Sequence, residues 1–391
     1  MKRYPGIRPF STDESDRFFG RGQDIERLWR LIRLEQVVIL YGKSGYGKSS
    51  LLSAGIYPKL ASPAVLPAVA LAQAGESASA TATAGKPDKR YQHWEVRFGP
   101  YQGADSRPPV ETLRSQITRM GGEQAERFPA DPFGATLWQV LKNHQTAAGK
   151  RFILFFDQFE EIFTYPPEQV AAFKEQLAEA LYTAVPDSVA IAELTPDQET
   201  ALNEPFELKV VFAIRADRMS QLNALQDYLP NLLRHSYQLD ALDERQATEA
   251  ITAPARLVTG DRLLVTGDRL PEAGAHQAPI TNTPITDHQT NQFDTPPFQY
   301  APAALALIFK ELRDPTTGKI ETSALQIVCR HVEDNIVAAD DRRREQPTNN
   351  QYTNNQYTNY PSAQPTWATL KPFSASSTTA PSPLCRRRNS P

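Results

Sequence analysis

The sequence predicts an α/β fold in which a parallel sheet lies between two layers of helices. Short apolar runs, typical of strands buried on both faces, alternate along the chain with segments of helical periodicity. Right-handed crossovers join strands that alternate with helices, and they leave the strands parallel and the helices on both faces. Ligands of such sheets bind beyond the carboxyl ends of the strands, so the residues that follow each strand are the first candidates for a site.

Five apolar runs are the expected strands, and the helical segments fall around and between them. The strands are expected at residues 37–41, 94–98, 152–156, 210–214 and 237–239. Helices are expected at residues 24–33, 109–120, 137–147, 167–183 and 219–233.

Other parts of the chain have little to bury. Residues 62–90 are rich in Ala, Ser, Thr and Gly, which predicts a long surface insertion. LVTGDRL occurs twice in tandem at 257–270, and NQYTN twice at 350–359; copies this short indicate sequence duplication, since solenoid repeats need about 20 residues or more. Residues 341–391 contain only three Leu, Ile, Val or Phe residues, so we expect a disordered low-complexity tail.

The composition argues against several classes of protein. With 42 Lys and Arg against 45 Asp and Glu, the net charge is −3, so a nucleic-acid or anionic-membrane binder is not expected. Two cysteines cannot form a disulfide framework, and no apolar leader or run of 18 apolar residues is present. We therefore expect a cytoplasmic protein. The six histidines lack the spacing of a zinc site.

The first expected strand leads into a glycine-rich motif, G-x-x-x-x-G-K-[ST], which a helical segment follows. Glycines let successive backbone N–H groups turn toward a phosphate chain, and the helix N-terminus adds a positive dipole end. Lys48 would neutralise the β and γ phosphates, and the Ser49 hydroxyl would help to hold Mg²⁺. An unrelated glycine-rich turn is the alternative, which the flanking strand and helix disfavour. The predicted nucleotide-binding residues are Gly42, Lys43, Ser44, Gly45, Tyr46, Gly47, Lys48, Ser49 and Ser50.

Acidic residues follow the third expected strand. Asp157 comes directly after the run 152–156 and is the candidate carboxylate for Mg²⁺, from a strand expected to neighbour that of the glycine-rich motif. Glu160 or Glu161 could polarise an attacking water as general base. The alternative is that both glutamates are exposed residues in the first turn of a helix, where its dipole favours acids.

Arg215 follows the fourth expected strand, at the same edge of the sheet. A cation there could sense the γ-phosphate of a bound nucleotide, because loss of that phosphate removes its partner. In the alternative reading, Arg215 is a surface residue paired with Asp217.

These motifs, taken in order, resemble the novel STAND NTPase 1 family, signal-transduction ATPases of the AAA+-related P-loop class. The resemblance rests on YPGIRPF at 4–10, RFFGR at 17–21, the P-loop with its SSLLSAGIYPKL continuation, DQFEE at 157–161 and RAD at 215–217, and it extends from about residue 3 to 340. It implies ATP and Mg²⁺ as cofactors and a regulatory switch as function. It also implies that Phe19, Gly20 and Arg21 border the adenine.

The resemblance further implies a helical lid and a winged helix after the sheet. We expect a P-loop NTPase domain over 1–256, a repeat-containing linker over 257–298, and a partial lid or the start of a winged helix over 299–340. Expected lid helices are 244–256 and 302–313, followed by a helix at 324–329. Thr322-Ser323-Ala324 stands where many relatives have a Gly-x-Pro or Leu-Pro element near the adenine.

The function expected is an ATP-binding switch that hydrolyses ATP slowly, with protein partners or self-association through the lid and further domains. Two alternatives stay open. One is a truncated, catalytically silent nucleotide-binding fragment or scaffold, because low-complexity sequence stands where the winged helix is expected. The other is a P-loop kinase acting on a small molecule.

Overall fold

The computed structural model describes residues 1–61, 91–121, 136–144, 151–189, 195–257 and 293–345. Contacts divide the chain into a unit over 1–343 and a second unit over 344–391, and of the second only 344–345 are described. The expected insertion 62–90, the NQYTN copies and all but the first residue of the LVTGDRL copies lie outside the described residues.

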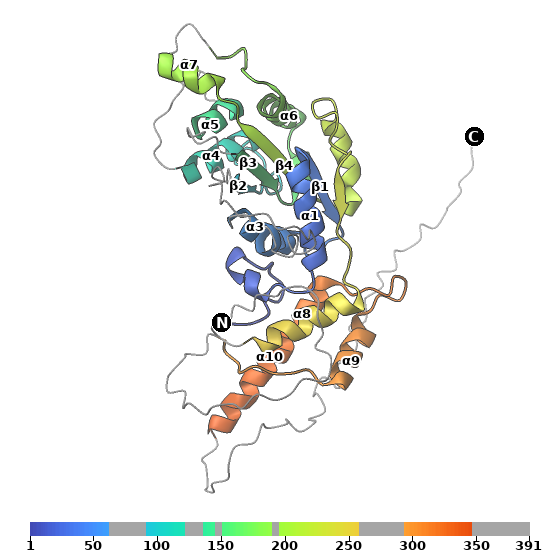
Figure 1. Ribbon diagram of the computed structural model, residues 1–391. Helices are drawn as coiled ribbons and strands as arrows, with labels where there is room; N and C mark the ends of the chain where they lie inside the picture. The colour runs from blue at the N-terminus through green and yellow to red at the C-terminus, as the bar shows by residue number, and fades with distance from the viewer. Residues whose placement is uncertain (62–90, 122–135, 145–150, 190–194, 258–292, 346–391) are drawn as a thin grey trace, which may run out of the picture. The chain divides into compact units, whose positions relative to one another are not determined.

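Five parallel strands form one sheet (Figure 1). They are β1 (Val37–Gly42), β2 (Tyr91–Val96), β3 (Arg151–Phe156), β4 (Glu207–Arg215) and β5 (Ser236–Gln238), in the order β2-β3-β4-β1-β5. The predicted α/β fold class and all five predicted strands are confirmed. The register sets Gly42 opposite Arg215 and Val96 opposite Phe156, so the carboxyl ends of β1 to β4 meet at one edge.

Helical segments cover both faces of the sheet. On one face α4 (Pro109–Gly121), α5 (Leu137–His144) and α6 (Pro167–Tyr182) pack on strand residues such as Ile39 and Phe212. On the other face α1 (Gly22–Leu34) and the helical segment after the P-loop pack on Leu40 and Ala213. That segment comprises α2 (Lys48–Ser50), the π-helical η2 (Leu51–Ile56) and α3 (Tyr57–Ala61). Because successive side chains of a strand point to opposite faces, apolar runs supply both layers.

One predicted helix is wrong. Instead of a helix over 219–233, the structure has the 3-10 segment η6 (Ala216–Leu225) followed by turns. Pro230 prevents a helix from continuing through this part of the segment, since it lacks a backbone N–H and its ring disfavours helical geometry in the preceding residue. Leu222, Leu225, Leu229 and Leu232 are all buried, and their helical spacing was the misleading signal. Further short elements are η1 (Thr12–Arg17), η4 (Phe159–Thr164) and α7 (Pro196–Asn203).

Three further helices surround a second, smaller core. They are α8 (Glu244–Arg256), α9 (Pro302–Leu312) and α10 (Thr322–Glu345), and we refer to them as the lid helices. Asp243 and Gln246 form a capping box that begins α8, and Pro302 occupies the first turn of α9. α10 continues beyond residue 341, and the remainder of the expected tail lies outside the described residues.

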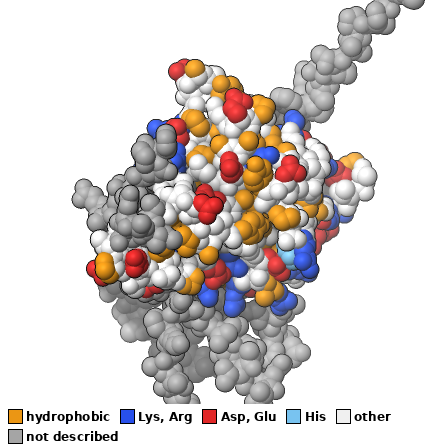
Figure 2. All heavy atoms as spheres, turned by 90° about the horizontal axis from the view of Figure 1, so that it is seen from above, with side chains coloured by type: hydrophobic (Ala, Val, Ile, Leu, Met, Phe, Trp, Pro, Cys, Tyr) orange, Lys and Arg blue, Asp and Glu red, His pale blue; other side chains and the backbone are white. Residues whose placement is uncertain are grey.

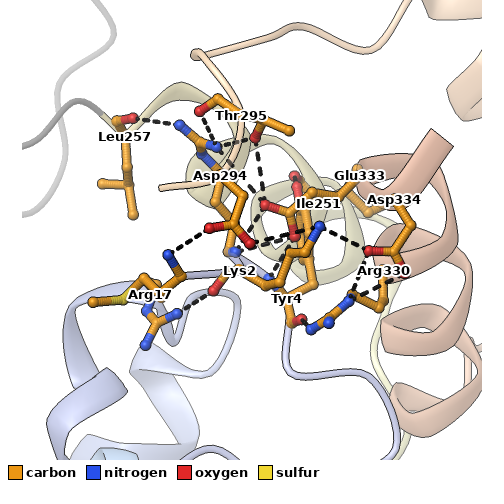
Figure 3. A network of polar contacts seen from close by, with 12 residues as sticks. Lys2, Tyr4, Arg17, Ile251, Leu257, Asp294, Thr295, Arg330, Glu333 and Asp334 are labelled. Carbon is orange, nitrogen blue, oxygen red and sulfur yellow. Dashed lines mark hydrogen bonds and ion pairs between the residues drawn. The ribbon is translucent and has the colours of Figure 1, made fainter. Parts of the chain in front are cut away.

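The chain's first residues are bound to the lid helices (Figure 3). Tyr4 is fully buried in the small core and donates its hydroxyl hydrogen bond to the Ile251 carbonyl. The Arg3 and Glu333 side chains are both 0% exposed, and the Glu333 carboxylate accepts the backbone N–H of Arg3 at 2.9 Å. Burial lowers the pKa of Arg3, and the Glu333 charge opposes that shift. Arg330 donates to the Tyr4 carbonyl at 2.9 Å.

Hydrophobic, acidic and basic side chains are interspersed on the face shown in Figure 2. In the parts of the chain that the structure describes, no helix has the length and apolar character needed to span a bilayer.

Candidate functional site

A cavity of about 420 Å³ lies at the carboxyl ends of the strands. The P-loop after β1, the segments that follow β2 and β3, and the end of β4 supply six of its charged residues: Lys48, Arg97, Asp157, Glu160, Glu161 and Arg215. Residues 6–10, the residues before α1, and α8 and α10 supply other walls. The sheet and the lid helices therefore both contribute to one site.

The P-loop turns back on itself through two glycines with positive φ. Gly45 has φ of +79° and Gly47 of +91°, conformations that other residues rarely adopt. The Lys48 Nζ donates to the carbonyls of Gly42 and Lys43, at 2.9 and 3.2 Å. Burial lowers the pKa of Lys48, while the charges of Glu160 and Asp157 oppose this shift. The lysine is therefore held at the loop by interactions that a phosphate could replace with a stronger charge pair.

Ser49 and Asp157 meet as the sequence predicts. The Ser49 Oγ donates to Asp157 Oδ2 at 2.7 Å. Their strands are not neighbours, since β4 lies between β1 and β3, which corrects the expected adjacency. The two side chains meet because the P-loop carries Ser49 beyond the strand ends.

These two residues fit a magnesium ion. Asp157 is 2% exposed, and its Oδ1 atom is buried without a hydrogen-bond partner among the described residues. A hydroxyl and a carboxylate are the hard oxygen donors that Mg²⁺ prefers. An ion would give the unpaired carboxylate oxygen a partner.

Arg97 is a site residue that the sequence reasoning missed. Its Nη2 atom lies 2.7 Å from Asp157 Oδ2 and 2.7 Å from Glu95 Oε1. Arg97 also lines the cavity. The predicted strand 94–98 placed Arg97 inside the strand, whereas β2 ends at Val96. A shorter strand would have put Arg97 among the residues that follow strand ends, where the other candidates were sought.

Glu160 and Arg215 face each other at the ends of β3 and β4. The Glu160 Oε2 atom accepts the backbone N–H of Arg215 at 3.3 Å. The Arg215 side chain donates to Asp217 at 3.0 and 2.9 Å, and this hydrogen bonding raises the pKa of Arg215. Glu160, Glu161 and Arg215 all line the cavity, so a cation and two carboxylates surround the space beyond Lys48.

The segment before α1 links the P-loop to the lid helices. Phe19 and Arg21 line the cavity. A Cβ at Gly20, whose φ is +82°, would collide with the Gln246 carbonyl of α8. Arg21 is 2% exposed and donates to the Tyr46 carbonyl at 2.8 Å and to Thr322 Oγ1 at 2.9 Å. Burial lowers the pKa of Arg21, against the opposing charge of Asp24.

The N-terminus of α10 rests on the P-loop. The Ser323 backbone N–H donates to the Gly45 carbonyl at 3.0 Å, and Thr322 Oγ1 donates to the Tyr46 carbonyl at 3.2 Å. A Cβ at Gly45 would meet only side-chain atoms of Glu321 and Ser323, which can move aside, so it is the φ of +79° that favours glycine at this position. The segment expected to take the place of a Gly-x-Pro element thus contacts the phosphate-binding loop.

Most predicted binding residues line the cavity, and a few lie behind it. The cavity is lined by Phe19, Arg21, Ser44, Gly45, Gly47, Lys48, Ser49 and Ser50. The predicted residues not among its lining are Gly20, Gly42, Lys43 and Tyr46. Gly42, Lys43 and Tyr46 act through backbone carbonyls, which accept from Lys48, Arg21 or Thr322.

Comparisons with known proteins give one family match. The family model described as Novel STAND NTPase 1 matches residues 4–263. No curated protein matches the chain.

Several solved structures are similar to parts of the chain at low identity. The Aeropyrum pernix ORC1 protein, solved in complex with DNA, is 13% identical with a TM-score of 0.35, covering 62% of this chain and 51% of its own. A Walker-type ATPase of Pyrococcus abyssi is 15% identical with a TM-score of 0.36, covering 63% and 60%. The ADP form of the Aeropyrum pernix ORC2 protein is 15% identical with a TM-score of 0.33, covering 58% and 49%. The chain thus spans about half to three fifths of these structures, and the likeness is too low to support an argument.

Proposed function

Because the chain belongs to the novel STAND NTPase 1 family, we propose that it is a regulatory switch that binds ATP with Mg²⁺, hydrolyses ATP slowly, and couples its nucleotide state to the lid helices. The contact between the N-terminus of α10 and the P-loop is the observation that carries this proposal.

The P-loop and the end of β3 provide the binding groups. Lys48 would pair with the β and γ phosphates, and Ser49 with Asp157 would hold Mg²⁺. The ion would screen the negative charge of the phosphates and orient them. The unpaired Oδ1 atom of Asp157 supports this role, since burial of an unpaired carboxylate oxygen is otherwise unfavourable.

Glu160 is the general base that we favour over Glu161. Its carboxylate is fixed by the backbone N–H of Arg215, and after burial it has the largest influence on the pKa of Lys48. A carboxylate held beside the phosphate-binding lysine can accept a proton from a water near the γ-phosphate. Arg215 would sense that phosphate by leaving Asp217, with which it now pairs.

The proposed coupling depends on hydrogen bonds between the P-loop and the N-terminus of α10. The carbonyls of Gly45 and Tyr46 accept hydrogen bonds from Ser323 and Thr322 of α10. Arg21 donates both to the Tyr46 carbonyl of the P-loop and to the Thr322 hydroxyl of α10. A ligand shifts a conformational equilibrium only by its different affinity for the two states. Phosphates bound by this loop would act on the backbone that holds α10, so a change at the γ-phosphate can reach the lid helices directly.

Lys48→Ala tests nucleotide binding. We expect affinity for ATP to fall on the order of 100-fold, because charge-assisted hydrogen bonds of about 3 kcal/mol are lost. Isothermal titration calorimetry measures this, and Lys310→Ala, at an exposed lysine of α9, is the matched control. Asp157→Asn should retain binding but lose Mg²⁺-dependent phosphate release. Unchanged ATP affinity in Lys48→Ala would contradict the proposal.

Hydrogen exchange tests the coupling. ATP should alter exchange of the backbone amides at the start of α10, around residues 322–326, more than exchange in α6, which lies on the sheet. Thr322→Val should weaken this response, because it removes the hydroxyl that contacts Arg21 and Tyr46. Exchange at α10 that ATP leaves unchanged in the unmodified protein would refute the switch while leaving nucleotide binding intact.

A second candidate function is a nucleotide-binding scaffold without hydrolysis, and one observation favours it. Arg97 pairs with Asp157 Oδ2, the oxygen that Ser49 also uses, so a cationic side chain already neutralises the metal carboxylate. The scaffold would be supported if the unmodified protein binds ATP but releases phosphate no faster than the Asp157→Asn variant does.

A further inference from the structure

We propose that Gln326 reads the base of the bound nucleotide and selects adenine over guanine. This inference rests on the proposed ATP binding and adds the residue that determines specificity. It depends on a buried amide in the wall of the cavity whose oxygen has no partner.

Apolar side chains form part of the cavity wall. Phe18, Phe19, Leu242 and Ala250 line the cavity there, and Phe18 packs on Phe10 with ring centroids 5.2 Å apart. A planar base is mainly apolar on its faces and would pack well against such walls.

Three arginines that also line the cavity already have carboxylate partners. Arg8 and Arg17 lie 2.5 and 2.9 Å from Glu14, and Arg21 lies 3.1 Å from Asp24. Arginines engaged in this way are poorly placed to recognise the edge of a base. Gln326 is therefore the polar side chain of interest in this part of the cavity.

Gln326 lies on α10 and lines the cavity with an unsatisfied amide. The residue is 7% exposed, and its Oε1 atom is buried with no hydrogen-bond partner among the described residues. A buried amide oxygen without a partner costs free energy, so it is typical of a site where a ligand completes the hydrogen bond.

The position along α10 places Gln326 between the phosphate-binding loop and the N-terminal segment. Thr322, four residues earlier, contacts the Tyr46 carbonyl of the P-loop. Arg330, four residues later, donates to the Tyr4 carbonyl and lies against Gly6. Residues four apart share a helix face and are about 6 Å apart along the axis. Gln326 thus faces the space one helical turn beyond the P-loop contact.

The chemistry of a carboxamide suits adenine. Its oxygen, the atom that lies buried without a partner among the described residues, can accept from the N6 amino group while its NH₂ donates to a neighbouring ring nitrogen. Guanine presents an acceptor, O6, in place of that amino group, and its adjacent N1–H and N2–H₂ donors call for a carboxylate. The carboxylates among the cavity's lining residues are Asp157, Glu160 and Glu161, all at the ends of β3 with the phosphate-binding groups.

Calorimetric titration of the full chain with ATP, GTP and ITP in Mg²⁺ tests this proposal. The unmodified protein should bind ATP more tightly than GTP or ITP, which both lack the 6-amino group. Gln326→Met should weaken ATP binding about tenfold and change GTP and ITP binding by less than about twofold. Gln169→Met is the matched control, because Gln169 also has a buried, unpartnered Oε1 but lies on α6 and is not among the cavity's lining residues.

The outcomes separate this inference from the proposed function. An unmodified protein that binds none of the three nucleotides contradicts the proposed function itself. ATP affinity that Gln326→Met leaves unchanged, or that falls in parallel with GTP affinity, overturns base reading alone. If the Met variant does not fold, Gln326→Glu decides, because a carboxylate accepts from N1–H and N2–H₂ of guanine. Its ATP-to-GTP affinity ratio should fall, and an unchanged ratio overturns the proposal.

Discussion

The two sides of the cavity are held in place by different forces. On the sheet side, Ser49, Asp157 and Arg215 lie at or just beyond the ends of strands whose apolar side chains are buried in two large clusters. On the lid side, α8, α9 and α10 share a smaller apolar cluster, and the buried pair of Arg3 and Glu333 ties them to the N-terminal segment. Extensive apolar burial stabilises the first side, and a smaller apolar cluster together with a few buried polar contacts stabilises the second.

This difference indicates which side can respond to a ligand. Apolar burial scales with area and keeps the strand ends in one arrangement. A buried ion pair contributes little net stability, because desolvation offsets its attraction, yet removal of one partner is costly. A region that depends on such contacts can change its arrangement when a few bonds exchange. The N-terminal segment crosses between the two sides, since Phe10 donates its backbone N–H to Ser50 Oγ at 3.1 Å.

The largest expected effect comes from Glu333→Ala, which removes the buried carboxylate that joins the lid helices to the N-terminal segment. The change leaves the Arg3 guanidinium and the N–H groups of Arg3 and Tyr4 buried without their carboxylate partner. We expect a loss of about 3 kcal/mol in the free energy of unfolding. Denaturant unfolding followed by circular dichroism measures this loss. Asp334→Asn, at a neighbouring residue about half exposed, should cost less than about 1 kcal/mol, and equal losses in the two variants would contradict a special role for Glu333.

A smaller effect, with a distinct pH dependence, is expected from Glu14→Gln, where the N-terminal segment joins the sheet side. Burial would raise the pKa of Glu14, but hydrogen bonds from Arg8 and the Ser11 N–H, with the charge of Arg17, lower it to about 2. A depressed folded-state pKa stabilises the fold above the unfolded value of about 4.5. That contribution is lost as the pH falls from about 4.5, the unfolded value, toward the folded value of about 2.

We therefore expect Glu14→Gln to lose about 2 kcal/mol of unfolding free energy at pH 7. The difference from the unmodified protein should shrink at acid pH, as denaturant unfolding between pH 3 and pH 7 would report. Asp13→Asn, at the exposed residue beside it, is the control and should leave stability nearly unchanged. A difference between the two proteins that stays constant with pH would argue against the ionised Glu14 carboxylate as its source.

The smallest effect is expected from Arg97→Ala, which tests the charge balance around Asp157 on the sheet side of the cavity. Without the guanidinium, Asp157 Oδ2 keeps only the Ser49 hydroxyl as a partner among the described residues, so its charge is more available to a cation. The Mg²⁺ concentration that half-saturates ATP binding should fall severalfold, as titration of Mg²⁺ at fixed ATP would measure. Arg107→Ala, at an exposed arginine of the same loop, is the control. A half-saturating concentration that does not move would show that Arg97 does not compete with the ion.

Local patterns predicted the sheet well. Strand β4 contains the unbroken apolar run 210–214, and β1 ends directly in the P-loop, so both were evident from residue order. The meeting of Ser49 with Asp157 was also predictable, because parallel strand ends lie at one edge. The helix expected over 219–233 failed because the spacing of its leucines suits 3-10 turns as well, and Pro230 prevents a helix from continuing to residue 233.

The sequence by itself determined the α/β fold, the P-loop and the acidic and basic residues that follow the strands, because these depend on neighbours in the chain. Only the tertiary structure decided that Arg21 bridges to Thr322, that Arg97 pairs with Asp157, and that the Gln326 oxygen is buried beside the cavity without a partner. Such contacts join residues tens to hundreds of positions apart. No local periodicity encodes them, since they arise only when the sheet and the lid helices pack around a common space.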